Sequence, residues 1–461
     1  MAMASQPAAL ARPGWTCALP WQDQDPRGLG RDAFRHGLLT RRALFAVLFA
    51  PASVPLMTHA SPPQTAWPQP VTVGAEVLAR SGFAALAGTR VGLITNQTGR
   101  VGAEHLADLL SRAPNLKLAA IFAPEHGLRG QAEAGAKVPS GVDAKTGVAI
   151  HSLYGATRKP TPAMLHNVDV LVFDIQDVGV RFYTYISTMG LAMQAAAAAR
   201  MPFVVLDRPN PLGGDYVAGF VLEPPLRSFV GEYPIPIVHG LTVGELAHMI
   251  QAERWLAGLD ALQLSVVAMQ GWRRSMRWHE TGRAWVATSP NIPSFEAALV
   301  YPGMGLVGEA QVSEGRGTPT PFSLFGAPWL DGQRLAARLN ALGLPGVTFE
   351  SLTFTPRAIA GVAAHPRFAG TALHGVRVAV TDVARVAPLE VGMHVLAAIA
   401  AEARARDITP LFANLKMLHA VAGTRRLNDM LLAGSNGAAI IAAWQSEVAQ
   451  FKMRRAPHLR Y

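Results

Sequence analysis

Short apolar runs alternate with segments of helical spacing over residues 71–290. Five runs rich in Val, Ile, Leu and Phe, as strands covered on both faces are, lie at residues 90–94, 118–122, 168–173, 203–206 and 264–267. Three segments with the spacing of helices lie at residues 104–111, 187–200 and 243–256. This alternation is typical of βαβ units, so we predict a Rossmann-like α/β domain with a mostly parallel sheet.

One helix start is marked clearly. Thr242 precedes the apolar pattern of residues 243–256, and Glu245 follows three residues later. In a capping box these two side chains satisfy each other's free backbone N–H groups. We therefore predict that a helix begins directly after Thr242.

Glycine and proline are dense from residue 291 to residue 328, with few helix formers among them. This composition predicts a long functional loop and hinge. Within it, Gly303-Met304-Gly305-Leu306-Val307-Gly308 matches the dinucleotide fingerprint by letter, but Pro302 precedes it and the flanking strand and helix are not predicted. We interpret the run as a turn, which argues against a nucleotide-dependent oxidoreductase.

Residues 329–461 show a second, smaller α/β pattern. A strand is predicted at residues 375–383, and helices at 388–405 and 438–451. The sequence therefore predicts two domains of α/β type joined by the glycine- and proline-rich segment.

The first 60 residues have the features of an export signal. The pair Arg41-Arg42 precedes an apolar stretch that runs to Met57, and the small residue Ala60 ends it before a Pro-rich leader at residues 61–70. The paired arginines resemble a twin-arginine signal. We expect an exported protein, periplasmic or secreted, with no stable membrane insertion after signal removal.

Charge and cysteine content exclude several function classes. The net charge is +10, but no Lys/Arg block is interleaved with aromatic residues, so we expect no nucleic-acid partner. The single cysteine, Cys17, precedes the predicted cleavage point, which excludes a disulfide framework and a cysteine nucleophile in the mature protein. The spacing of His239 and His248 fits no zinc motif, so we expect no metal.

Polar residues follow four of the predicted strands. These segments are Thr95-Asn96-Gln97-Thr98-Gly99, Pro124-Glu125-His126-Gly127, Asp174-Ile175-Gln176-Asp177 and Asp207-Arg208-Pro209-Asn210-Pro211. In open parallel sheets, ligands bind beyond the carboxyl ends of the strands. We therefore expect these segments to meet at one edge and to form a cleft.

Carboxylates at this edge are suited to cleavage of a glycosidic bond. The reaction needs a carboxylic acid that protonates the leaving oxygen, and usually a second carboxylate as base or nucleophile. Glu125 suits the first role, although it could instead cap a helix or pair with Arg129. Candidates for the second carboxylate are Asp174, Asp177 and Glu314, and attack by an acetamido group of the substrate itself is an alternative.

Eight motifs in order carry a resemblance to a known family. They are NQTG at 96–99, APEHGLRG at 123–130, DVLVFDIQDVGVRFYTYISTM at 169–189, LDRPNPLGG at 206–214, HGLTVGELA at 239–247, SPNIPS at 289–294, YPGMGL at 301–306 and SEGRGTPTPF at 313–322. From about residue 71 to its end, the chain resembles the NamZ-type exo-β-N-acetylmuramidases, formerly a bacterial domain family of unknown function.

The resemblance implies a Rossmann-like domain joined to a smaller domain, an active cleft between them and no required cofactor. It implies release of N-acetylmuramic acid from the non-reducing ends of peptidoglycan-derived glycans during cell-wall turnover, with Glu125 as the favoured catalytic carboxylate. Muramic acid carries a lactyl carboxylate, which an arginine can bind through two parallel hydrogen bonds. The candidates for substrate binding are Asn96, His126, Arg181, Tyr183, Tyr185, Asp207, Arg208, Asn210, His239, Asn291 and Arg316.

The chain departs from the family pattern at one place. The family tends to have Glu-Gly-Thr-Asn where this chain has Gly308-Glu309-Ala310-Gln311, so the carboxylate is displaced by one position. This departure leaves an alternative function open: a non-catalytic protein that binds or senses muramyl sugars on the same fold.

Overall fold

The structure is a computed structural model that describes residues 69–130, 132, 135–136 and 139–461. The predicted export signal and residues 61–68 of the Pro-rich leader lie outside the described residues. Everything described belongs to one unit, Thr65–Tyr461.

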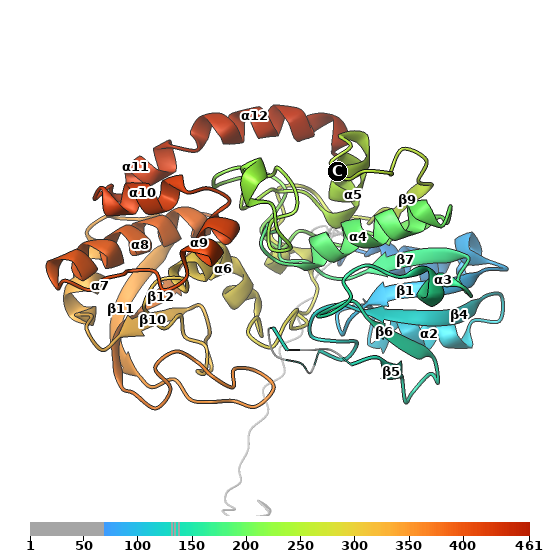
Figure 1. Ribbon diagram of the computed structural model, residues 1–461, viewed down its shortest axis with the longest axis horizontal. Helices are drawn as coiled ribbons and strands as arrows, with labels where there is room; N and C mark the ends of the chain where they lie inside the picture. The colour runs from blue at the N-terminus through green and yellow to red at the C-terminus, as the bar shows by residue number, and fades with distance from the viewer. Residues whose placement is uncertain (1–68, 131, 133–134, 137–138) are drawn as a thin grey trace, which may run out of the picture. The chain divides into compact units, whose positions relative to one another are not determined.

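A seven-stranded sheet forms the larger part of this unit (Figure 1). In spatial order its strands are β5 (Gly141–Val142), β6 (Ala149–Ser152), β4 (Lys117–Ala123), β1 (Arg90–Thr95), β7 (Val170–Asp174), β8 (Phe203–Leu206) and β9 (Leu264–Val267). Every pairing is parallel except that of β5 with β6. The Rossmann-like, mostly parallel sheet predicted from the sequence is confirmed.

Helices cover both faces of the large sheet, which explains why its central strands are apolar throughout. Side chains of α1 (Gly74–Arg80) and α2 (Leu106–Arg112) pack with Leu93 and Val172 in one cluster. Side chains of α4 (Tyr185–Ala198) and α5 (Val243–Ala252) pack with Phe173 in another cluster, on the opposite face. The predicted capping box at the start of α5 is confirmed, because Thr242 and Glu245 bond each other's backbone N–H groups.

A second, smaller sheet has three antiparallel strands in the order β10, β12, β11. Their bounds are β10 (Leu324–Ala327), β12 (Leu373–Val380) and β11 (Val347–Phe354). The helices that follow β9 in the chain are α6 (Phe295–Val307), α7 (Gly332–Asn340), α8 (Pro388–Ala405), α9 (Leu415–Ala422), α10 (Arg426–Leu432), α11 (Gly437–Ala442) and α12 (Gln445–Arg455). The second α/β part expected from the sequence is therefore present. Two very short strands, β2 (Arg100–Val101) and β3 (Glu104–His105), and the short helix α3 (Pro162–Leu165) complete the unit.

The expectation of a loop from residue 291 to residue 328 is wrong over Phe295–Val307, which forms the buried helix α6 with Pro302 inside it. The interpretation of Gly303 to Gly308 as a turn is wrong for the same reason. A Cβ atom on Gly303 would lie 2.7 Å from the Cα of Gly392 in α8, so glycine allows the two helix backbones to meet. Close packing against α8 thus outweighs the poor helix propensity of glycine and proline.

The helix predicted at residues 438–451 is also interrupted. The structure divides it into α11 and α12, with Ala443 and Trp444 between them. Trp444 is almost fully buried and packs edge-on against Phe220, at 5.3 Å between ring centroids. The chain bends here to bury this side chain, which helical periodicity alone does not indicate.

Candidate active site

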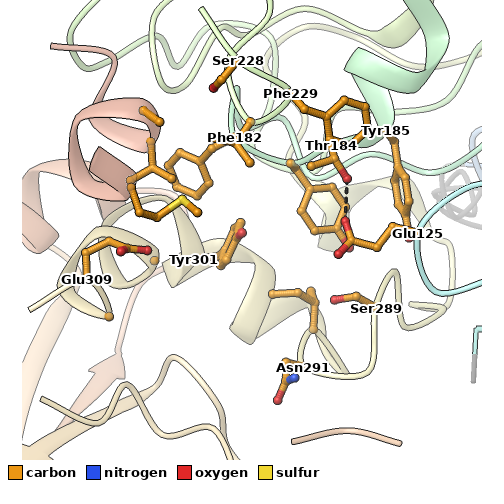
Figure 2. A pocket seen from close by; sticks show the side chains of 18 of the residues that line it. Glu125, Phe182, Thr184, Tyr185, Ser228, Phe229, Ser289, Asn291, Tyr301 and Glu309 are labelled. Carbon is orange, nitrogen blue, oxygen red and sulfur yellow. Dashed lines mark hydrogen bonds between the residues drawn. The ribbon is translucent and has the colours of Figure 1, made fainter. Parts of the chain in front are cut away.

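A cavity of about 670 Å³ lies between loops of the large sheet and elements of the smaller part. Figure 2 shows side chains from both parts around it. Its polar and aromatic lining residues are Glu125, His126, Tyr154, Arg158, Phe182, Tyr183, Thr184, Tyr185, Ser228, Phe229, Ser289, Asn291, Tyr301, Glu309, Arg316, Phe322, Asn414 and Lys416. A mixed aromatic and polar lining of this kind is suited to a sugar, which has an apolar ring face and a rim of hydroxyl groups.

Glu125 is held in place by the loops around it. It follows β4 and Pro124, and it is half-buried. The Thr184 hydroxyl donates to Glu125 Oε2 at 2.7 Å, and the Gly135 N–H donates to Glu125 Oε1 at 3.0 Å (Figure 2). Burial, and next the charge of Glu125, raise the pKa of Tyr154. Both carboxyl oxygens are therefore oriented, while the residue still lines the cavity.

Aromatic side chains form one wall of the cavity. The Tyr183 hydroxyl donates to Thr288 Oγ1 at 2.9 Å, and the Tyr185 hydroxyl donates to the Thr288 carbonyl at 2.7 Å. Tyr301 of α6 meets the ring of Tyr183 edge-on at 5.9 Å and that of Phe322 at 4.8 Å. Burial raises the pKa of Tyr183, Tyr185 and Tyr301, so all three phenols are neutral hydrogen-bonding groups.

Two arginine side chains line the cavity. Arg158 is exposed and lies over the Phe229 ring, 4.4 Å from its centroid. Arg316 donates from Nη1 to Glu314 Oε1 at 2.6 Å, and its Nε is buried without a partner among the described residues. Burial lowers the pKa of Arg316, but the charge and hydrogen bond of Glu314, together with the charges of Tyr301 and Glu309, raise it overall. Arg316 is therefore a permanent cation with an unused donor.

His126 and Asn291 add two polar groups of defined state. The Nδ1 of His126 lies 2.7 Å from the Ala132 carbonyl, and burial lowers its pKa, so the ring is neutral with Nδ1–H as the donor. Asn291 donates from Nδ2 to the Val362 carbonyl at 2.7 Å, while its Oδ1 is buried without a partner among the described residues. Asn291 therefore has a free acceptor at the cavity.

The remaining candidate residues from the strand ends do not line this cavity. Asp174 and Arg208 form a buried ion pair through two hydrogen bonds, of 2.6 and 2.9 Å. Asn96 accepts from the N–H and the hydroxyl of Thr98 through its Oδ1. Asp174 and Arg208 thus join the loops after β7 and β8, and Asn96 is bonded within its own loop through Oδ1, while its Nδ2 has no partner among the described residues.

A second group of candidates is also bonded internally. Arg181 is fully buried and donates to the carbonyls of Phe220, Ile235 and Val421, and burial lowers its pKa to about 9. Asn210 donates to the Leu241 carbonyl and accepts from the Leu212 N–H. His239 accepts from the Leu241 N–H through Nδ1, and burial lowers its pKa to about 3. Asp207 accepts from the hydroxyls of Thr242 and Tyr461 and from the Gly244 N–H.

Of the candidates for a second carboxylate, Asp177 and Glu314 lie behind the lining. Burial raises the pKa of Asp177 to about 7, its Oδ1 accepts from the Gly179 N–H, and its Oδ2 has no partner among the described residues. Glu314 is buried and bonded to Arg316. The second carboxylate that does line the cavity is Glu309, opposite Glu125 with Tyr301 between them in Figure 2.

Sequence reasoning did not select several lining residues as candidates. Glu309 is part of the departure from the family pattern, which by itself does not indicate a cavity residue. Thr184 lies between Tyr183 and Tyr185, which were the candidates in that motif. Tyr154, Arg158 and Lys416 lie in segments without a recognisable motif, and none of them follows a strand that the sequence predicted. Only the folded chain brings them to the cavity.

Within the described part of the chain, no helix is both long and apolar enough to cross a membrane. The same residues contain no group of three or more His, Cys, Asp or Glu side chains placed to hold a metal ion.

Comparisons with known proteins agree along the whole described chain. The N-terminal profile of the exo-β-N-acetylmuramidase NamZ family matches residues 91–296, and its C-terminal profile matches residues 299–461. Peptidoglycan β-N-acetylmuramidase NamZ of Bacillus subtilis (strain 168) is 42% identical over 427 residues, covering 92% of this chain and 98% of that protein. Two crystal structures of DUF1343 family proteins from Bacteroides fragilis NCTC 9343 are 38% and 34% identical, with TM-scores of 0.78 and 0.68. Each covers 85% of this chain and 99% of the other.

Proposed function

The chain belongs to the exo-β-N-acetylmuramidase NamZ family, and from this premise we propose that it is a glycoside hydrolase acting on peptidoglycan-derived glycans. The reaction is release of N-acetylmuramic acid from the non-reducing end. The observation that carries the proposal is the Glu125 carboxyl group, oriented by Thr184 and Gly135 at the wall of a sugar-sized cavity.

Glu125 is the general acid in this proposal. A carboxylic acid in this role donates its proton to the glycosidic oxygen as the bond to the sugar ring breaks. The Thr184 hydroxyl and the Gly135 N–H restrict the carboxyl group to one orientation, so the proton is delivered in a defined direction. The rings of Tyr183 and Tyr301 offer an apolar surface for the sugar.

Two groups could attack the anomeric carbon. Asp174, Asp177 and Glu314 do not line the cavity, and Glu309 lies across it from Glu125 with Tyr301 between them, so the attacking group in this proposal is either a water molecule or the acetamido oxygen of the substrate. The free Oδ1 of Asn291 supports the second route, because it can accept from the acetamido N–H and hold that group in place. Asn291→Asp keeps an acceptor oxygen and should retain more activity than Asn291→Ala. Equal loss of activity in the two variants would contradict this role for Asn291.

Arg316 is the group proposed to bind the lactyl carboxylate. Arg181 donates to backbone carbonyls and Arg208 donates to Asp174, and neither lines the cavity. Arg316 does line the cavity, and its Nε has no partner among the described residues. A guanidinium binds a carboxylate through parallel hydrogen bonds and distinguishes it from a hydroxyl. Muramic acid would thereby be selected over glucosamine.

The test compares two leaving groups. Glu125→Gln should lower kcat about 100-fold or more on a disaccharide of N-acetylmuramic acid and N-acetylglucosamine, since a sugar alkoxide needs a proton to leave. The loss should be much smaller on the 4-nitrophenyl muraminide, whose leaving group is a weak base. Equal losses on both substrates would remove Glu125 from the acid role.

The matched control is Glu104→Gln, which removes an exposed carboxylate paired with Arg112 outside the cavity and should leave both rates unchanged. The 4-nitrophenyl glucosaminide should not be cleaved. Binding of the muraminide without any release by the unaltered protein would favour a binding or sensing protein instead.

Export is part of the same proposal. Peptidoglycan lies outside the cytoplasmic membrane, and Arg41-Arg42 with the apolar stretch to Met57 has the pattern of a signal. The mass of the protein recovered from its source cells checks this, because cleavage near Ala60 removes the first 60 residues. A full-length mass in the cytoplasmic fraction would contradict export.

A further inference from the structure

Glu309 is a carboxylate of the cavity lining that no described residue bonds. It directly follows Gly308 at the end of α6, lines the cavity and is half-buried. No hydrogen bond or ion pair reaches its carboxylate from the described residues within ordinary distances, whereas Glu125 has two fixed donors. An unpaired carboxylate at a ligand cavity is expensive to keep unless it acts on the ligand or on a neighbour.

The neighbour of interest is Arg316, which already has one anionic partner in Glu314. Both residues line the same cavity, and Glu314, the partner of Arg316, packs against Gly308, the residue directly before Glu309. Burial raises the pKa of Glu309, and the charge of Arg316 lowers it by a smaller amount. The side chains that face Glu309 are Arg316, Glu314, Arg367 and Tyr301, and Lys416, His126 and Glu125 complete the ionisable lining of the cavity. Arg316 thus serves two carboxylates before any substrate enters.

An anionic sugar brings a third carboxylate to this group. If Glu309 and Glu314 both stayed ionised, the lactyl carboxylate would be attracted by Arg316 and repelled by both of them. Glu314 is buried and bonded to Arg316, so it cannot leave. Glu309 has no such bond, and burial already raises its pKa, so Glu309 is the group that can give up its charge.

We propose that Glu309 is a specificity-determining residue that takes up a proton when the carboxylate of an anionic sugar binds Arg316. The inference rests on the proposed function, because it requires that carboxylate to lie at Arg316. Before binding, Glu309 is ionised, and its negative charge near Arg316 repels other anions. After binding, neutral Glu309 is a hydrogen-bond donor to the sugar, and the proton comes from solvent.

Proton linkage predicts the direction and the size of the pH dependence of the binding affinity. If binding takes up one proton, the affinity falls by a factor that approaches about ten for each unit rise in pH, over the range where Glu309 is ionised in the free protein. A neutral sugar such as N-acetylglucosamine brings no third carboxylate, so its binding should show no such slope.

The experiment is calorimetric titration of the whole mature protein with N-acetylmuramic acid, in two buffers of different ionisation enthalpy, between about pH 5 and pH 8. The unaltered protein should take up close to one proton in part of this range. Glu309→Gln should take up none, lose the pH slope, and bind the acid about tenfold more tightly at the upper end. Glu309→Ala should also lose the slope.

The matched control is Glu296→Gln, because Glu296 is an exposed carboxylate in the first turn of the same helix α6 and should behave as the unaltered protein does. The proposal is overturned if Glu309→Gln keeps the proton uptake, since another group would then be responsible. It is also overturned if the unaltered protein hydrolyses the muraminide but binds the acid without uptake, and in that case the proposed function stands. No binding and no hydrolysis would remove both.

Discussion

Two polar regions of this protein begin at the same edge of the large sheet and differ in what their side chains do. The loop after β4 carries Glu125 and His126 into the cavity, with Tyr154 beyond β6 beside them. The loops after β1, β7 and β8 carry equally polar residues, but there Asp174 bonds Arg208 and Asp207 bonds Thr242 and Tyr461. The first region presents its polar groups at the cavity, whereas in the second the charged groups of Asp174, Arg208 and Asp207 hold the loops together.

The difference shows that position at a strand end does not separate binding residues from structural ones. Access to the cavity does, since Glu125 accepts two hydrogen bonds from the protein and still lines the cavity, whereas Asp177 Oδ2 has no partner among the described residues and yet does not line it. Substitutions in the second region should therefore affect stability first, whereas Glu125→Gln and Glu309→Gln should affect catalysis or binding and leave stability nearly unchanged.

The largest effect on stability is expected for Asp174→Asn. The substitution leaves Arg208, which is 5% exposed, as a buried charge without its partner. Removal of one partner from a buried ion pair costs about 3–5 kcal/mol of unfolding free energy. Urea unfolding of the variant and the unaltered protein measures this difference.

Asp169→Asn is the matched control for that measurement. Asp169 lies directly before β7, and Asp174 is the last residue of that strand. Like Asp174, Asp169 pairs with an arginine, but the Arg90–Asp169 pair is exposed. Solvent and salt screen such a pair, so its loss should change stability far less. Equal losses for the two variants would break the distinction between the buried region and the surface.

The sequence predicted the architecture because its signals are local. Central strands such as β1 and β7 are apolar runs, and Thr242 with Glu245 marks the start of α5. Helix α6 was missed because its glycines are explained by Gly392, a residue nearly 90 positions away from Gly303 along the chain. Contacts at that separation leave no periodic trace.

The candidate site was predictable only in part, for a related reason. The sequence singled out Glu125, Tyr183 and Arg316, and the structure places all three at the cavity. It gave equal weight to Asp174 and Arg208, because nothing in the order of residues shows that these two side chains bond each other across 34 positions. Partner choice is decided by the fold, so it could be learned only from the structure.

A smaller effect, with a defined pH dependence, is expected for Asp207→Asn. Burial raises the pKa of Asp207 to about 6, above its ordinary value of 3.8, so the folded state holds this proton more tightly than the unfolded chain does. The corresponding stability is full below about pH 4 and is lost as the pH rises to about 6. The total is about 3 kcal/mol, since one pKa unit corresponds to about 1.4 kcal/mol.

The asparagine side chain cannot ionise, so the Asp207→Asn variant should lack this part of the pH dependence. Urea unfolding at several pH values checks this prediction. The unfolding free energy of the variant, minus that of the unaltered protein, should rise by about 3 kcal/mol between pH 4 and pH 7. A constant difference across this range would mean that Asp207 titrates as it does in the unfolded chain.

The smallest effect is expected for Tyr461→Phe, at the C-terminal residue. The Tyr461 hydroxyl donates to Asp207 Oδ2 at 2.8 Å and accepts from the Met269 N–H at 2.9 Å, while its ring packs edge-on against Trp272. Phenylalanine keeps the ring contact and loses both hydrogen bonds, so the unfolding free energy should fall by about 1–2 kcal/mol.

This loss should depend on pH and on Asp207, which links the last prediction to the one before it. The hydroxyl bond stabilises the ionised form of Asp207 and lowers its pKa, so the Tyr461→Phe loss should be larger at pH 7 than at pH 4. In an Asp207→Asn background the pH dependence of the loss should disappear. A double-mutant cycle at the two pH values measures this coupling. If Tyr461→Phe loses the same unfolding free energy at pH 4 and at pH 7, the hydroxyl does not act through the Asp207 carboxylate. The contrast between internally bonded groups and cavity groups would then be weaker at Asp207 than at Asp174.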